Sequence, residues 1–218
     1  SNPYPRIGHP SEKNINEEDI NNLIDWLTKT DMYTKGEQTI KFEDEWSNWQ
    51  NCKYSVFVNS GSSANLLVIA SLLYSNRLRN KKIIVPAVSW VTTVSPAIML
   101  GLEPIMCDAD ENNLGFSIDD FENLCREHRP AAAILVHVLG HANHMKEIVD
   151  ICNRYDVLLI EDSCEAHGSI YGGKKVGNFG IASTFSFYYG HQMSTVEGGM
   201  VCTNDQELYN VMLSIRSH

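Results

Sequence analysis

Short apolar runs alternate along this chain with longer amphipathic stretches. The short runs, rich in Val, Ile and Leu, are typical of buried strands, whereas apolar residues at every third or fourth position are typical of helices. We predict strands at 54–58, 83–86, 104–107, 132–138, 157–161 and 184–188, and helices at 16–28, 40–49, 66–74, 91–100, 118–127 and 145–155. Because strand–helix units connect parallel strands by right-handed crossovers, the pattern predicts one α/β domain with a mostly parallel sheet.

The stretch 158–200 carries most of the candidate chemistry. A predicted buried strand leads there into Glu161 and Asp162, and His191 follows the next apolar strand. Parallel strands end at one edge of a sheet, where α/β proteins bind ligands, so we expect Asp162 and His191 at that edge. Asp162 either pairs with a cationic atom of a bound ring or is an N-cap for the next turn, with Glu165 three residues later as in a capping box.

A turn of small residues, 59–65, connects strand 54–58 to a helix. Backbone N–H groups at a helix N-terminus attract anions, and the serine hydroxyls add donors. The turn therefore either binds a phosphate or is an ordinary helix cap, and it matches neither a P-loop nor GxGxxG. Trp90, near the end of strand 83–86, either fills the core or offers a flat surface to a ring.

Other polar residues near strand ends have less specific interpretations. His137, His141 and His144 follow one strand with the spacing H-x3-H-x2-H, but no carboxylate is interleaved. We expect hydrogen-bonded or solvated histidines there and no metal site. Ser186 and His191 combine a phosphate donor with a general base. A hydrolase triad is disfavoured because the chain has no GxSxG elbow.

Composition narrows the class of protein. The 218 residues suffice for one substantial α/β domain, and 43% apolar with 20% charged residues is typical of globular proteins. The net charge of -10 disfavours nucleic-acid binding, and no apolar run is long enough to span a bilayer. Six scattered cysteines without a CxxC pair favour reduced thiols. We therefore expect a cytoplasmic protein that binds neither nucleic acid nor membrane.

Four motifs, in this order, resemble the sugar aminotransferase/dehydratase family of fold-type I pyridoxal-phosphate enzymes, the DegT/DnrJ/EryC1/StrS type. They are SGSSAN at 60–65, VPAVSWVTTVSP at 85–96, IEDSCEAHG at 160–168 and FSFYYGHQMSTVEGG at 185–199. The resemblance implies the three-layer α/β/α large domain of the aspartate aminotransferase fold over residues 1–218, with an N-terminal arm. We expect the C-terminal small domain of such enzymes to lie outside these residues, because the sequence ends directly after a helical pattern. The resemblance also implies a homodimer.

The resemblance assigns a role to each cofactor-binding residue. The implied contacts are Gly61 and Ser62 with the phosphate, Ser186 as a further phosphate donor, Trp90 stacked on the pyridine ring, Asp162 at its protonated nitrogen and Glu165 near its hydroxyl. A carboxylate is unusual at the last of these positions. Asp162 would keep the ring an electron sink.

His191 departs from the aminotransferase pattern. Aminotransferases of the family have a lysine five residues after the FSF serine, and that lysine bonds the cofactor covalently. An imidazole has no primary amine, so the cofactor would stay untethered. This departure resembles two 3-dehydratase branches, which both use pyridoxamine 5'-phosphate. One acts on GDP-4-keto-6-deoxy-D-mannose and resembles this chain through GHQMSTVEGG, and the other is an iron–sulfur enzyme acting on CDP-4-keto-6-deoxy-D-glucose.

The first branch implies a lyase that removes the C3 hydroxyl of a nucleotide-linked 4-keto-6-deoxy sugar, with His191 as the sole base. L-Glutamate would restore the cofactor amine and ammonia would leave, in dideoxysugar biosynthesis for a surface polysaccharide. Three alternatives stay open. They are the iron–sulfur branch, with Cys164 beside Asp162, a sugar aminotransferase, and a regulatory scaffold that binds the cofactor without catalysis.

Overall fold

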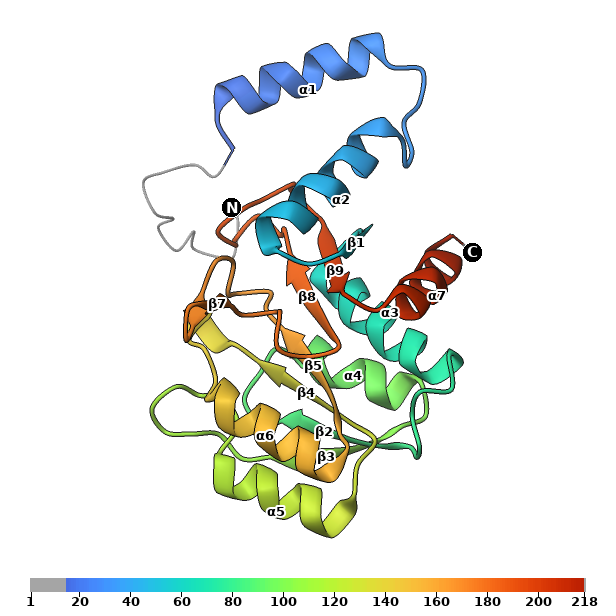
Figure 1. The fold of residues 1–218 in the computed structure, drawn as a ribbon. Coiled ribbons are helices and arrows are strands. Elements are labelled where there is room, and N and C mark those ends of the chain that lie inside the picture. The colour runs from blue at the N-terminus through green and yellow to red at the C-terminus, as the bar shows by residue number, and fades with distance from the viewer. Residues whose placement is uncertain (1–14, 218) are drawn as a thin grey trace, which may run out of the picture.

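A computed structural model describes residues 15–217 and contains a seven-stranded sheet in the order β1-β9-β8-β5-β4-β2-β3 (Figure 1). The strands are β1 (Tyr54–Val58), β2 (Lys82–Pro86), β3 (Glu103–Cys107), β4 (Ala132–Val136), β5 (Leu158–Asp162), β8 (Ala182–Ser186) and β9 (Gly199–Thr203). Only β9 runs against its neighbours, because it pairs antiparallel with both β1 and β8. The predicted mostly parallel α/β sheet is confirmed. A small antiparallel hairpin, β6 (Ile170–Tyr171) and β7 (Lys174–Lys175), follows β5.

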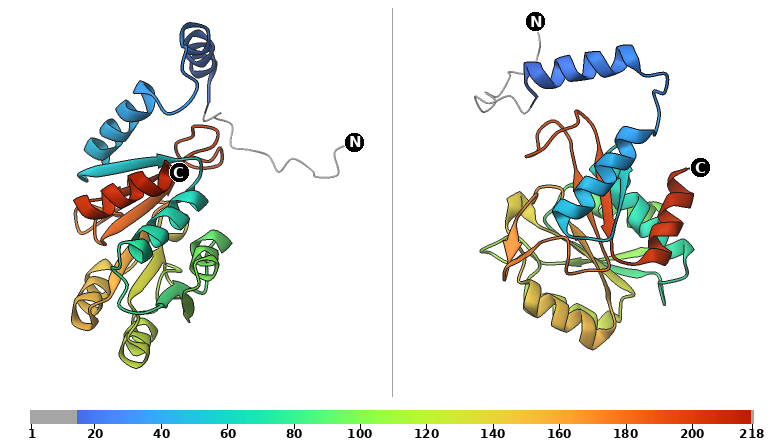
Figure 2. Two further views of the ribbon diagram at one scale, coloured as in Figure 1. Left: turned by 90° about the vertical axis from the view of Figure 1, so that its right-hand side faces the viewer. Right: turned by 45° about the horizontal axis from the view of Figure 1, so that its top comes forward.

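Helices cover both faces of the sheet (Figure 2). They are α1 (Glu17–Lys29), α2 (Glu37–Gln50), α3 (Gly61–Tyr74), α4 (Val91–Met99), α5 (Ile118–His128), α6 (Met145–Tyr155) and α7 (Gln206–Arg216), with a 3-10 turn η1 (Val138–Gly140). Neighbouring strand residues face opposite layers. On β2, Ile83 packs into the cluster with α3, α4 and α7, whereas Ile84 packs into the cluster with α5 and α6. This two-sided burial explains the continuous apolar runs.

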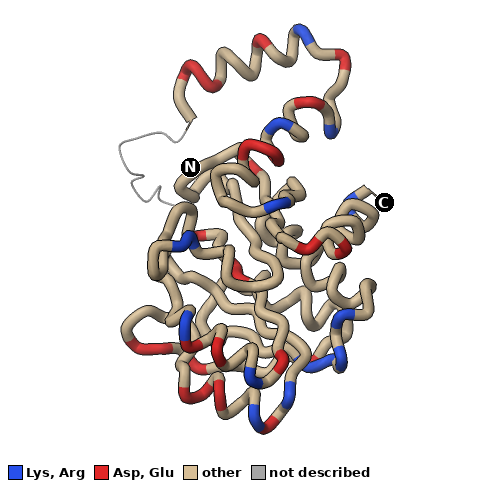
Figure 3. Tube along the Cα trace, in the orientation of Figure 1, with Lys and Arg blue, Asp and Glu red and all other residues tan. Residues whose placement is uncertain are grey.

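Helix α1 projects from the body of the protein and has no buried residue (Figure 1). Asn16 caps it in a capping box with Asp19, as the sequence predicts a helix start there. Charged residues gather on outer helices such as α1, α5 and α6, and the central strands carry few (Figure 3). The predicted extended arm, 1–16, lies outside the described residues up to position 14. Within residues 15–217, no helix has both the length and the apolar character needed to cross a membrane.

Several predicted boundaries differ from the structure near glycines. Helix α3 begins at Gly61 rather than 66, because the Ser60 hydroxyl accepts a hydrogen bond from Ser63 N at 3.1 Å and caps it. Strand β9 begins at Gly199, the second glycine of the pair 198–199, and was not predicted. Its first residue must be glycine, since a Cβ on Gly199 would lie 2.2 Å from the carbonyl oxygen of Ser60. The start of β9 therefore lies against the N-terminal cap of α3, although the two segments are far apart in the sequence.

Candidate active site

The carboxyl ends of β5 and β8 meet the N-terminus of α3. Asp162 ends β5 and pairs in register with Thr184 of β8, so Ser186 lies two residues further along the same edge. A Cβ on Gly61 would lie 2.7 Å from the Cβ of Ser186, which places the first turn of α3 directly against this serine. Ser62 follows, and its hydroxyl donates to Thr92 Oγ1 at 3.1 Å. The structure thus brings four of the predicted site residues to one edge.

The first turn of α3 suits an anion. Gly61 and Ser62 occupy its first two positions, where a backbone N–H has no acceptor inside the helix, and no other described residue accepts from them. The Ser186 hydroxyl accepts from Tyr188 N at 3.3 Å, so its own proton remains to be donated. The lack of a side chain at Gly61 leaves room above Ser186. These donors fit the phosphate of the expected cofactor.

Asp162 is 3% exposed, and hydrogen bonds occupy part of the acceptor positions of its carboxylate. Oδ2 accepts from Asn65 Nδ2 at 2.8 Å and from Thr93 Oγ1 at 2.9 Å, and Oδ1 accepts from Cys164 N at 3.1 Å. Thr184 orients the Asn65 amide by donating to its Oδ1 at 2.7 Å. A carboxylate has about four lone-pair sites, and described residues fill three. The remaining site fits the N–H of a protonated pyridine.

Asp162 caps the turn that follows it, because its Oδ1 accepts from Cys164 N, but the capping box with Glu165 does not form. Residues 163–169 form turns rather than a helix. The Glu165 side chain does not reach back to Asp162, because its Oε2 accepts from Leu139 N at 2.7 Å. Leu139 has a left-handed backbone, with φ of 52°, and its η1 turn presents this N–H to Glu165. Glu165 is thereby fixed at the rim of the same edge.

His191 lies in the turn after β8, where its backbone N donates to the Tyr188 carbonyl at 3.0 Å. Its ring is partly buried and lies edge-on to the rings of Tyr188 and His167, with centroids 6.0 and 6.3 Å away. Burial lowers the pKa of His191 below its usual value, and the negative charges of Glu165 and Asp162 offset part of this effect. A neutral imidazole facing two carboxylates is a base that can accept a proton near neutral pH.

Trp90 does not fill the core, because 74% of its side chain is exposed. It precedes α4, whose first turn supplies Thr92 to Ser62 and Thr93 to Asp162. The indole makes no ring–ring contact with another residue of 15–217. The core-filling interpretation of Trp90 is therefore wrong, and its stacking on a ring stays a prediction.

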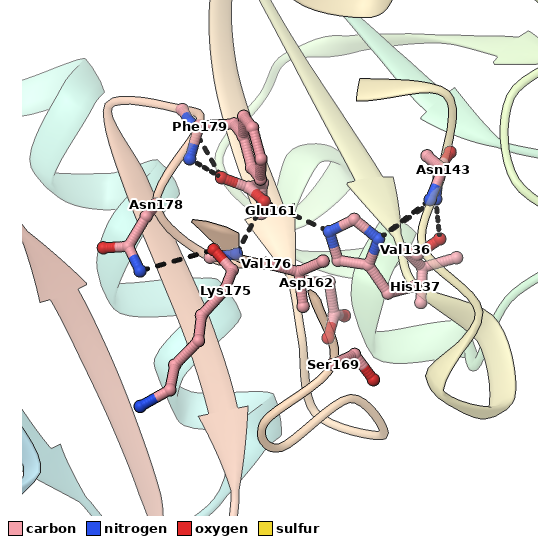
Figure 4. Close-up of polar contacts among 12 residues, drawn as sticks. Val136, His137, Asn143, Glu161, Asp162, Ser169, Lys175, Val176, Asn178 and Phe179 are labelled. Carbon is pink, nitrogen blue, oxygen red and sulfur yellow. Dashed lines mark hydrogen bonds and ion pairs between the residues drawn. The ribbon is translucent and has the colours of Figure 1, made fainter. Parts of the chain in front are cut away.

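A second polar network lies behind the site (Figure 4). Glu161 is fully buried and accepts from the backbone N–H groups of Gly177, Phe179 and Gly180 at 2.6, 2.6 and 2.7 Å. Its fourth partner is Nε2 of His137 at 3.1 Å. Asn143 N donates to Nδ1 of that ring, so the proton of the neutral imidazole is on Nε2. No dashed line joins Asp162 to this network.

The three histidines with the spacing H-x3-H-x2-H therefore have three different surroundings. His137 is buried in the network, His141 is exposed, and His144 lies 3.8 Å from Asp110. Among residues 15–217 no group of three or more potential ligands is placed to hold a metal ion. Sequence reasoning missed Asn65, Thr93 and the partners of Glu161, since only the packing of distant elements reveals them.

The fold and this edge define a fold-type I enzyme large domain with three layers. A family model, the DegT/DnrJ/EryC1/StrS aminotransferase family, matches residues 14–218. The chain belongs to this family, which confirms the resemblance carried by its motifs.

Among curated relatives, the chain is similar to two GDP-4-keto-6-deoxy-D-mannose 3-dehydratases. The one from Yersinia pseudotuberculosis is 36% identical over 97% of this chain and 54% of the relative. The one from Escherichia coli O55:H7 is 40% identical over 86% of this chain and 49% of the relative. The chain thus spans about half the length of these relatives.

Solved structures agree with these similarities. The E. coli 3-dehydratase with bound hydrated PLP has a TM-score of 0.89 and 36% identity, covering 97% of this chain and 54% of that one. A GDP-4-keto-6-deoxymannose-3-dehydratase with a trapped PLP-glutamate geminal diamine has a TM-score of 0.88 and 36% identity, covering 99% and 55%. The three-layer fold is therefore the fold of known cofactor-binding relatives.

Proposed function

We propose that this chain is the cofactor-binding large domain of a pyridoxal-phosphate-dependent 3-dehydratase, and that the full-length protein acts on GDP-4-keto-6-deoxy-D-mannose. The observation that carries the proposal is the histidine at position 191, at the edge where Asp162 and Ser186 meet. Lys174 and Lys175, the nearest lysines along the chain, lie over the rings of Phe179 and Trp49 instead. The named relatives with this activity support the choice of substrate.

The side chains at this edge fit a bound pyridoxamine 5'-phosphate. Gly61, Ser62 and Ser186 would hold its phosphate, Asp162 its ring nitrogen, and Trp90 a face of its ring. When bound, the cofactor supplies an amine that condenses with the C4 ketone of the sugar and a ring that accepts electrons. Asn65 and Thr93 keep Asp162 oriented, because both donate hydrogen bonds to its Oδ2.

His191 would move the proton at the C4′ carbon of the cofactor, so that the C3 hydroxyl of the sugar can leave. Its lowered pKa keeps the ring neutral and ready to accept that proton at neutral pH. Glu165 and Asp162 then stabilise the imidazolium that forms. Because an imidazole cannot bond the cofactor covalently, nitrogen would leave as ammonia, and L-glutamate would restore the amine. The relative trapped with a PLP-glutamate adduct supports this co-substrate.

We also propose that the full-length protein is a cytoplasmic homodimer in the biosynthesis of a dideoxysugar for lipopolysaccharide. Exposed apolar residues of α4 support an interface, since Val91, Ile98 and Met99 are 64%, 62% and 71% exposed. A curated relative from Salmonella typhimurium, 33% identical, is a lipopolysaccharide biosynthesis protein.

The test is turnover of GDP-4-keto-6-deoxymannose and L-glutamate by the full-length protein. The proposal expects one ammonia and one 2-oxoglutarate per sugar, and a sugar product that has lost one oxygen atom. An aminotransferase would give an amino sugar and no ammonia, and a scaffold would bind the cofactor without turnover. Either of these results would overturn the proposal.

The iron–sulfur branch has less support from Cys164. Burial, followed by the negative charge of Asp162, raises the pKa of this thiol well above its usual value. A cysteine that ligates iron must be a thiolate, and this environment disfavours the thiolate. Iron analysis of the purified full-length protein separates the two branches, since the proposal expects dehydration without bound iron.

A further inference from the structure

His167 occupies an aromatic site directly beside His191. Its ring stacks on the rings of Phe187 and Phe185, with centroids 5.6 and 5.9 Å away and interplanar angles of 5° and 17°. The indole of Trp46 closes a third side edge-on at 5.7 Å. Trp46 belongs to α2, Phe185 belongs to β8, and Phe187 directly follows β8. His167 is therefore held by rigid elements rather than by its own turn.

The polar side of the His167 ring reaches the residue that follows His191. Nδ1 of His167 lies 3.1 Å from Oε1 of Gln192, and Nε2 of Gln192 donates to the carbonyl oxygen of Glu165 at 2.7 Å. Since the Gln192 amide nitrogen is the donor to Glu165, its oxygen must accept, and Nδ1 of His167 carries a proton. A short chain of hydrogen bonds thus ties the turn of His191 to the turn of Glu165.

The other ring nitrogen makes this arrangement unusual. Nε2 of His167 is buried and has no hydrogen-bond partner among the described residues. Burial, and next the charge of His191, lower the pKa of His167 to about 4. A buried polar atom without a partner costs stability, so an imidazole is not what simple packing of this aromatic cluster would select. Phenylalanine would fill the same space, but it could not donate to Gln192.

We propose that His167 is a positioning residue for the reaction: its Nδ1–H holds Gln192, and thereby fixes His191 against Glu165. The inference rests on the proposed function for its consequence in catalysis. His167 itself takes no proton near neutral pH, since its pKa is lowered to about 4. The aromatic rings fix the plane of the donor, and the donor fixes the turn that carries the base.

Two matched variants of the full-length protein separate packing from hydrogen bonding. His167→Phe keeps the stacked ring and loses the donor, whereas His167→Asn loses the ring but its amide can still donate from the position of Nδ1. Because displacement of a catalytic group by about 1 Å can cost about 100-fold in rate, we expect kcat to fall about 10- to 100-fold in His167→Phe, with KM changed less than about two-fold. Partial recovery is expected in His167→Asn. The control His128→Asn, in the last turn of α5, should match the wild type.

Coupling between the two residues tests the route. If His167 acts through Gln192, then Gln192→Leu lowers kcat to a similar extent, and the double variant His167→Phe/Gln192→Leu is no slower than either single variant. Multiplying losses in the double variant, or an unchanged kcat in His167→Phe, would overturn the proposal.

Nitrogen NMR of the cofactor-free protein gives a readout that does not need turnover. Near pH 7 we expect the ¹⁵N shifts of His167 to show a neutral ring with its proton on Nδ1, and the ring signal of His191 to move in His167→Phe. A proton on Nε2 would contradict the positioning role even if the enzyme is active. Conversely, absence of dehydration in the wild type would reject the proposed function, while these shifts would still decide the role of His167.

Discussion

Two neighbouring carboxylates on β5, Glu161 and Asp162, show how this fold separates a structural site from a chemical one. Glu161 accepts four hydrogen bonds from Gly177, Phe179, Gly180 and His137, which fill its lone-pair sites (Figure 4). Asp162 accepts three, from Asn65, Thr93 and Cys164. Successive strand residues face opposite sides of a sheet, so two adjacent acids serve different networks.

Burial and charge alone do not identify a functional acid. Both carboxylates are almost inaccessible, at 0% and 3% exposure. What differs is the number of acceptor positions left for a ligand, and the position left on Asp162 belongs to Oδ1.

Removing the carboxylate of Glu161, which accepts four hydrogen bonds, should prevent stable folding. In Glu161→Leu, three backbone N–H groups and the His137 Nε2–H lose their acceptor inside the protein. Breaking such a buried charged network costs about 3–5 kcal/mol, a large share of the stability of a typical domain. Chemical denaturation monitored by circular dichroism measures the loss. A Glu161→Leu protein within about 1 kcal/mol of the wild type would show that this network is dispensable.

The imidazole of His167 should lower the stability of the protein in acid. One of its nitrogens is buried without a described partner, and its pKa is about 4, below the 6.5 of an unfolded histidine. Below pH 6.5 the unfolded chain binds a proton that the native His167 refuses, so the free energy of unfolding falls between pH 6.5 and 4 by about 3 kcal/mol.

Denaturation curves measured at each pH, on wild type and on His167→Phe, isolate this contribution. The variant should have a flatter pH dependence in that window. Asp205, whose pKa is lowered from 3.8, loses its contribution only at still lower pH and does not confuse the comparison. Parallel curves for the two proteins would contradict the account.

Neutralising Asp162, which accepts only three hydrogen bonds, should preserve the fold and weaken cofactor binding. Asp162→Asn keeps the shape of the side chain but loses the charge that faces the ring nitrogen. A hydrogen bond to a charged group contributes about 1.5–3 kcal/mol, so we expect cofactor affinity to fall roughly 10- to 100-fold. Titration with pyridoxamine phosphate, followed by absorbance, measures it. Unchanged affinity would mean that Asp162 does not touch the ring nitrogen.

Thr93→Val should have the smallest effect. The substitution preserves the shape of the side chain and removes one of three hydrogen bonds to Asp162, which is worth about 1 kcal/mol. We expect cofactor affinity to fall about five-fold at most and the fold to persist. The same absorbance titration, run beside Asp162→Asn, ranks the two. A Thr93→Val effect as large as that of Asp162→Asn would place the threonine in direct contact with the cofactor.

Much of the fold could be predicted because its strands are buried on both faces. Such strands read as continuous apolar runs, and β1 and α6 were predicted with the bounds that the structure has. The missed elements are β9, whose first glycine depends on a distant contact, and the β6–β7 hairpin, which turns at Gly172 and Gly173 with positive φ. Gly199, for example, is required by the carbonyl of Ser60.

The site was predictable only where chemistry follows strand ends. Asp162 and His191 could be placed at one edge because they follow neighbouring parallel strands. The donors Asn65 and Thr93 face Asp162 only after α3 and α4 pack on the sheet. The role of His167 has no local sequence signal. The rings that hold it, Trp46, Phe185 and Phe187, come from distant parts of the chain.

The most direct test of an untethered cofactor is the absorbance of the full-length wild-type protein and His191→Lys, each mixed with pyridoxal phosphate and then reduced with borohydride. Only His191→Lys should bond the cofactor covalently, and mass spectrometry should then find the cofactor on residue 191 and no dehydration by that variant. Covalent label on any lysine of the active wild-type protein, or dehydration by His191→Lys at the wild-type rate, would contradict the account.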